Sequence, residues 1–239
     1  MSCTESPLPP HHKIVIIGTM DYLLIFVIIG GIVLIAVAIS YLAERRRSSQ
    51  LEKVGQELKL NFYPSDPHRQ LRRQFALFYL FDKGRNRRIS NYIEGEREND
   101  VHIAIFDYQY SLGRGRRSKL VKQSVAHLSS EHLHTPVFRL HPEGIWKKLE
   151  HTIFQKQDID FSSHPVFSDA YQLTGPEEEE IREYFNEERL AFFGAHTGWN
   201  MEVFPHRILI YKDGVRLKPK DIPAFLRESM EVFDVLSGD

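Results

Sequence analysis

The chain has almost no cysteine: Cys3 is the only one, and it precedes every predicted folded element. An internal disulfide, a CxxC zinc site and a buried cysteine nucleophile are therefore excluded. The motifs of common enzyme classes are missing as well, since the sequence holds no GxSxG, GxxxxGK[ST], GxGxxG or HExxH. We therefore expect no cofactor, and the sequence favours a non-enzymatic function over an enzymatic one.

An overall excess of charge is also missing, since 31 Lys+Arg stand against 32 Asp+Glu. The charges are unevenly placed, however: residues 44–122 hold 18 Lys+Arg and 10 Asp+Glu, whereas residues 123–239 hold 12 and 20. The aromatic residues are not interleaved with the arginines, as they are in a base-stacking surface. We therefore expect no nucleic-acid partner.

What the sequence does contain is one long apolar run without a charge, Tyr22–Leu42, whose 21 residues would span about 31 Å as a helix. Arg45, Arg46 and Arg47 follow it. A cleavable signal peptide, cut after Ala36-Val37-Ala38, is the rival interpretation. However, the apolar run is long, and Lys13 is the only lysine or arginine before it. We predict an uncleaved transmembrane helix over residues 22–43.

The balance of lysine and arginine around this span predicts its orientation. Five cations lie within 20 residues on its C-terminal side, against Lys13 alone on the other side. We predict a single-pass protein of the plasma (inner) membrane, with its N-terminus outside and its C-terminal domain in the cytoplasm. Translation could begin at Met1 or at Met20.

The remaining chain predicts an α+β fold in which a mainly antiparallel sheet packs with amphipathic helices. Its predicted parts are an N-terminal tail (1–21), the transmembrane helix (22–43), a juxtamembrane helix (44–63) and a soluble α+β domain (64–239). Strands are expected over residues 88–96, 101–110, 120–128, 137–140, 167–173, 199–204 and 208–211. Helices are expected over residues 66–75, 141–149, 176–193 and 222–236.

Three basic clusters are the candidate binding residues, because cations near an anionic leaflet gain about 1 kcal/mol each. The alternative is a topogenic signal followed by two solvated loops. The candidate lipid- or partner-binding residues are Arg45, Arg46, Arg47, Arg85, Arg87, Arg88, Arg114, Arg116, Arg117 and Lys119.

A group of histidines is the candidate metal site. His127, His132, His134 and His141 lie within fifteen positions, and His132-x-His134 would place two rings on one face of a strand. Glu131 lies among them, but residues 129–135 are expected to form a loop and no further carboxylate stands at ligand spacing. A polar loop is therefore the preferred interpretation, and we predict no metal. Asp107, in the middle of a strand, is either a carboxylate paired with an arginine or a catalytic group.

Four segments carry a resemblance, namely 106–111 (FDYQYS), 123–126 (QSVA), 136–143 (PVFRLHPE) and 164–171 (HPVFSDAY). From about Leu51 onward the chain resembles a group of uncharacterised bacterial single-pass membrane proteins with a cytoplasmic domain of unknown function. The resemblance implies no activity for any residue.

Our first hypothesis is a membrane-tethered cytoplasmic interaction module that contacts anionic lipid or a membrane-protein partner. The second is a membrane-anchored, metal-dependent hydrolase that uses the histidine cluster and Asp107. A structural subunit whose span packs in a larger complex is a third.

Overall fold

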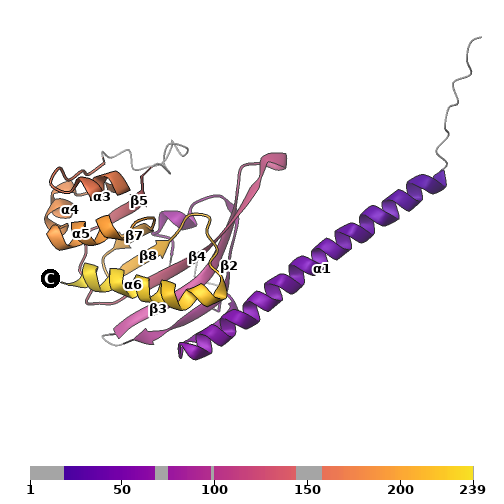
Figure 1. Cartoon of the computed structure of the whole chain (residues 1–239), viewed down its shortest axis with the longest axis horizontal. Coiled ribbons are helices and arrows are strands. Elements are labelled where there is room, and N and C mark those ends of the chain that lie inside the picture. Colours follow the sequence, from indigo (N-terminus) through magenta and orange to yellow (C-terminus); the bar gives the residue numbers. More distant parts are fainter. Residues whose placement is uncertain (1–18, 68–74, 98–99, 144–157, 239) are drawn as a thin grey trace, which may run out of the picture. The chain divides into compact units, whose positions relative to one another are not determined.

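The structure is a computed structural model that describes residues 19–67, 75–97, 100–143 and 158–238 (Figure 1). The chain divides into two compact units, Met1–Arg46 and Arg47–Asp239. Helix α1, Thr19–Glu57, crosses this boundary, so its last eleven residues belong to the second unit.

The first unit, where it is described, consists of the N-terminal part of α1. This helix is long and apolar enough to cross a membrane, and none of its most apolar stretch is buried within the structure. Apolar side chains such as Phe26 and Leu34 are exposed on it. Since water does not favour such a surface, the length and composition of α1 are those of a membrane span.

The second unit is built on one eight-stranded sheet in which every pairing is antiparallel. The strand order is β1-β2-β3-β4-β8-β7-β5-β6. The strands are β1 (Asn61–Ser65), β2 (Arg85–Arg97), β3 (Val101–Leu112), β4 (Lys119–Ser129), β5 (Phe138–Pro142), β6 (Tyr171–Thr174), β7 (Asn200–Phe204) and β8 (Arg207–Tyr211). The predicted α+β class with a mainly antiparallel sheet is confirmed.

The helices are short except for α1 and the last one. They are α3 (Pro165–Ala170), α4 (Glu178–Tyr184), α5 (Glu187–Ala195) and α6 (Ile222–Ser237), with 3-10 turns η1 (Tyr79–Phe81), η3 (Gly115–Arg117) and η5 (Pro219–Asp221). In Figure 1, α6 lies across the sheet and α3, α4 and α5 gather at the end that carries β5.

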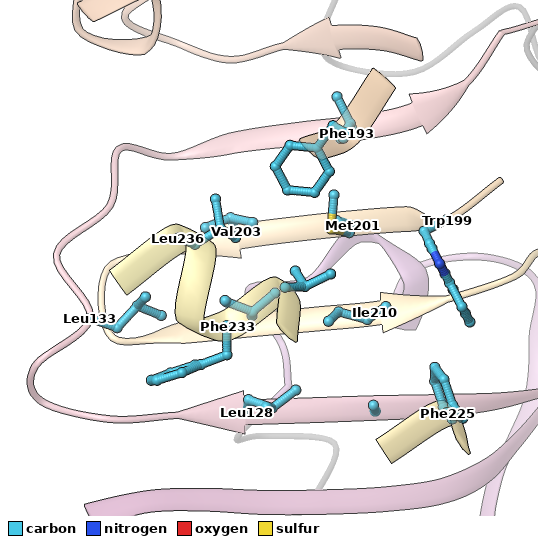
Figure 2. Packing of buried hydrophobic residues seen from close by; sticks show 14 of the residues in the cluster. Leu128, Leu133, Phe193, Trp199, Met201, Val203, Ile210, Phe225, Phe233 and Leu236 are labelled. Atoms are coloured by element: carbon cyan, nitrogen blue, oxygen red, sulfur yellow. The ribbon is translucent and has the colours of Figure 1, made fainter. Parts of the chain in front are cut away.

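Both faces of the sheet are covered. Successive residues of β3 point to opposite faces, and the strand has apolar side chains on each of them. Ile103 and Ile105 face a large core that also includes α6 and the domain part of α1, whereas Phe106 and Tyr108 face an aromatic core closed by residues 75–81. In the first core, Leu128, Met201 and Ile210 of the sheet lie opposite Phe225 and other residues of α6 (Figure 2). The strand expected over residues 101–110 is therefore confirmed, and it lies between two cores.

Several predicted elements differ from the structure. Residues 167–173 were expected as one strand, but the chain forms α3 first, with Pro165 at its start, and only then β6. Residues 176–193 were expected as one helix, but Asn186 separates α4 from α5 by capping α5, its side chain accepting a hydrogen bond from the Arg189 N–H at 3.0 Å.

The edge strand β1 was not expected at all. Pro64 lies within it, as is tolerated where a strand has a neighbour on one side only. Most of the helix predicted over residues 66–75, and of that predicted over 141–149, lies outside the described residues, although His141 and Pro142 belong to β5.

Candidate functional site

The β2–β3–β4 meander brings two of the three predicted basic clusters to one end of the sheet. Arg85 pairs with Ser111 in the register of β2 and β3, and Leu112 pairs with Lys119 across the β3–β4 hairpin. The Arg85 Nη2 donates to the Gly113 carbonyl at 2.7 Å, which ties the start of β2 to the hairpin loop. Charges that are about 30 positions apart in the sequence therefore form one surface.

We call this surface the basic end of the sheet, formed by the exposed cations Arg85, Arg88, Arg114, Arg117 and Lys119. On the side of β4 the hairpin tip extends beyond the neighbouring strand (Figure 1), because β8 pairs with β4 only from Val125 onward. Leu120 lies beside these cations and is 51% exposed. An apolar side chain framed by cations suits an anionic, partly apolar surface.

The side chain of Arg87, a predicted binding residue, binds the backbone of the turn that precedes it, residues 82–84. Its Nε lies 3.2 Å from the Lys83 carbonyl and 3.1 Å from the Gly84 carbonyl, and its Nη2 donates to the Asp82 carbonyl. It therefore stabilises the start of β2. Nothing is described for the side chain of Arg116.

The third cluster, the arginine triplet, is divided between the two units. Arg45 and Arg46 are exposed residues of the first unit, whereas Arg47 is the first residue of the second. Arg47 binds Asp107 in bidentate fashion, with Nε 2.8 Å from Oδ2 and Nη2 2.7 Å from Oδ1, and its Nη1 donates to the Leu217 carbonyl at 2.7 Å. This geometry assigns Arg47 to the fold of the domain.

Asp107 is the centre of this cluster, and its buried carboxylate accepts from four residues. Besides Arg47, Arg216 donates to Oδ2 through Nε and Nη2 at 3.1 and 2.9 Å, Asn91 Nδ2 lies 2.8 Å from Oδ2, and Ser124 Oγ lies 3.3 Å from Oδ1. Burial by itself would raise the pKa of Asp107, but Arg47 and Arg216 together hold it below its usual value. A carboxylate bound on both oxygens by guanidiniums is an ion pair, not an available general base.

A β-bulge supplies the amide in this cluster. The pairing of β2 with β3 shifts between Ser90 and Ile93, and Asn91 has a positive φ of 51°. Such a bulge re-aims a side chain, here toward Asp107. Ser48 Oγ of α1 in turn lies 2.5 Å from Asn91 Oδ1, so the helix contacts the cluster through both Arg47 and Ser48.

The four histidines of the predicted cluster lie in different surroundings. The His127 ring packs against Phe75 and Phe78, and burial lowers its pKa to about 3. His141 is buried with Nδ1 3.0 Å from Asn200 Oδ1, and burial lowers its pKa to about 4. His132 and His134 are exposed. Among the residues that the structure describes, no three His, Cys, Asp or Glu side chains are arranged to hold a metal ion.

A second buried carboxylate, Glu202 of β7, was not identified from the sequence. It accepts from the Tyr79 and Leu80 N–H groups at 2.5 and 3.0 Å and from the Tyr211 hydroxyl at 3.0 Å. Burial raises the pKa of Glu202, and burial also lowers the pKa of the neighbouring Lys83. The only sequence signal was a carboxylate between the apolar Met201 and Val203. Its contacts fasten η1 onto the sheet.

Comparison with known proteins gives one kind of information, the fold. No protein-family model and no curated protein matches the chain. The crystal structure of the mycobacterial trehalose monomycolate transport factor A, TtfA, is similar, with a TM-score of 0.54, 80% of this chain and 95% of that chain covered, and 11% identical residues. At this identity the similarity shows that the two chains share an architecture.

Proposed function

We propose that this chain is a membrane-tethered, non-enzymatic interaction module whose basic end binds anionic phospholipid headgroups of the inner leaflet. One observation carries the proposal: the sheet register brings two exposed cations of β2 and three of the β3–β4 hairpin to one end of the sheet, where Leu120 is also exposed. A set of solvated loops would have no reason to converge on one place.

The tether makes a modest affinity sufficient. At about 1 kcal/mol per cation near an anionic leaflet, the basic end would gain roughly 5 kcal/mol, and burial of Leu120 would add to this. Only four residues separate Leu42, at the end of the apolar run, from Arg47. A domain held on so short a connection meets the bilayer surface at a high effective concentration, so a contact too weak to recruit a free protein still forms.

Two further observations support the proposal. The excess of arginine after the span favours a cytoplasmic domain, where the leaflet is anionic. TtfA, which shares the architecture, is named a transport factor, and this supports an accessory, transport-related role over catalysis. The alternative of a hydrolase draws no support from the geometry, because Asp107 is bound by two arginines and the histidines are separated.

The proposal can be tested on the full-length protein in lipid nanodiscs. Ser118, exposed on the hairpin, is replaced by cysteine in a Cys3→Ser background and labelled with an environment-sensitive dye. In discs with about one third phosphatidylglycerol we expect a blue-shifted emission, absent in pure phosphatidylcholine and lost near 1 M salt, where the Debye length falls to about 3 Å.

Charge reversal identifies the residues responsible. Arg114→Glu with Arg117→Glu should abolish the blue shift, whereas Lys220→Glu with Arg227→Glu, an equal change of charge at exposed positions elsewhere, should leave it in place. An emission that is the same in both lipids, or equally sensitive to both double variants, would show that the hairpin does not bind anionic lipid.

A further inference from the structure

A shallow groove with a volume of about 440 Å³ lies beside α4. All of its lining residues belong to the C-terminal half of the chain, residues 123–239, where Asp and Glu outnumber Lys and Arg. Its lining includes Thr135, Pro136, Tyr184 and Pro205, with Glu180 and Glu183 on its rim. Three segments that are distant in the sequence meet here: the chain before β5, the β7–β8 turn and α4.

The floor of the groove is rigid and mainly apolar. Thr135 and Pro136 are buried, and the Thr135 hydroxyl donates to the Phe204 carbonyl at 3.2 Å, which ties the segment before β5 to the end of β7. The Tyr184 hydroxyl donates to the Leu236 carbonyl, so its ring is fixed as well. Rigid proline and tyrosine surfaces lose little conformational entropy when a partner binds.

The rim carries negative charge that the described part of the chain does not neutralise. Glu180 and Glu183 are exposed and make no ion pair among the described residues. The nearby cations are engaged elsewhere: Arg182 binds Glu178 and the Asp160 carbonyl, both at 2.8 Å, and the buried Arg189 donates to carbonyl groups of the domain.

The position of these carboxylates suits a bound cation. Residues at i and i+3 of a helix have Cβ atoms about 5–6 Å apart, close enough for two carboxylates to flank one guanidinium or ammonium group. Acidic residues in the first turn of α4 are explained by the helix dipole, but Glu183 stands in its last turn, where a negative charge is disfavoured. The helix dipole therefore does not account for Glu183.

We propose that this groove docks an extended, basic segment of a partner protein. One arginine or lysine of that segment lies between Glu180 and Glu183, and an adjacent apolar residue or proline covers Pro136 and Pro205. Charge complementarity selects this partner, because an anionic leaflet is repelled by the same carboxylates. The site is independent of the basic end of the sheet.

The test uses full-length protein in a neutral detergent, immobilised through Cys3. A random heptapeptide phage library is selected on the wild type and counter-selected on Glu180→Lys with Glu183→Lys. We expect enriched peptides with arginine or lysine beside proline or leucine. A synthetic copy should bind the double variant roughly tenfold more weakly. Glu228→Lys with Glu231→Lys, the same spacing on α6, should change binding less than about twofold.

Each other result rejects the proposal. No enrichment, enrichment of uncharged or acidic peptides, or equal binding to both double variants would show that the groove is not a site for basic segments. Sedimentation of the wild type tests a second copy as the occupant: self-association that Arg114→Glu with Arg117→Glu abolishes would assign the groove to the hairpin of another copy. Those hairpin substitutions should otherwise leave peptide binding unchanged.

Discussion

The three charged residues of the buried ion cluster, Arg47, Asp107 and Arg216, should contribute unequally to the stability of the domain. Arg47 and Arg216 both depend on Asp107, so the cluster has two guanidiniums and one carboxylate. Removing the shared anion leaves two cations facing each other in a poorly solvated place, whereas removing one cation leaves a simple ion pair. The cost of substitution should therefore depend on which member is changed.

We expect Asp107→Asn to lower the free energy of unfolding by about 3 kcal/mol or more, and Arg47→Gln or Arg216→Gln to cost clearly less. Urea unfolding of a fragment that starts at Glu44 would measure this. Equal effects of all three substitutions would mean that Asp107 is not the shared centre. Because the pKa of Asp107 is lowered, its contribution is present above its unfolded value and is lost as the pH falls through the folded value.

The sequence predicted one half of this cluster. A carboxylate in the middle of an apolar strand predicts an arginine partner, and the structure confirms that pairing. The sequence did not identify Arg47 as this partner, because Arg47 lies 60 positions away. It also belongs to an arginine triplet whose presence is already explained as a topogenic signal after the predicted span. The same reason hid Glu202, whose partners are mostly backbone N–H groups, which leave no trace in a sequence.

At the scale of elements, side-chain capping decides where helices end. The apolar periodicity over residues 176–193 predicts one helix, yet Asn186 accepts from the Arg189 N–H and begins a second one. A side chain that competes with the backbone for hydrogen bonds can outweigh periodicity. Strands such as β3 and β4 were predictable, because they are long and have two apolar faces or end in a clear turn. In such strands no capping side chain interrupts the apolar pattern.

Replacing Asn186 by alanine should lower the free energy of unfolding by about 1 kcal/mol, since the N-cap hydrogen bond is lost. Asn186→Asp keeps an acceptor at the same position and should retain most of the stability. Thermal and urea unfolding of both variants would measure the difference. If alanine and aspartate behaved alike, the break between α4 and α5 would owe nothing to the cap.

On the scale of the whole molecule, buried histidines link stability to pH. His127 has a pKa near 3 in the folded state, against 6.5 for the ordinary side chain, because its partly buried ring packs against aromatic rings and is desolvated. The unfolded chain thus binds a proton between these values that the folded chain does not. This contribution is present above pH 6.5 and is lost as the pH falls toward 3.

His127→Phe should remove this dependence, since a phenyl ring suits the aromatic surroundings. Between pH 7.5 and 5.0 the wild type should lose about 2 kcal/mol of stability relative to the variant. Comparing the two proteins cancels the opposite effects of Glu202 and of Asp158, whose pKa burial raises to about 6. Parallel stability curves for the two proteins would contradict a His127 ring that stays neutral in the folded state.

The order of strands in the sheet also has a consequence for synthesis. β4 and β8 are neighbours in space, but β8 begins 78 residues after β4 ends. At a translation rate of about 5–20 residues per second, the far edge of β4 stays without its partner for roughly 4–16 s. The apolar run of α1 leaves the ribosome before β4 does. If α1 is inserted in a membrane as proposed, the unpaired edge of β4 is exposed near that membrane during this interval.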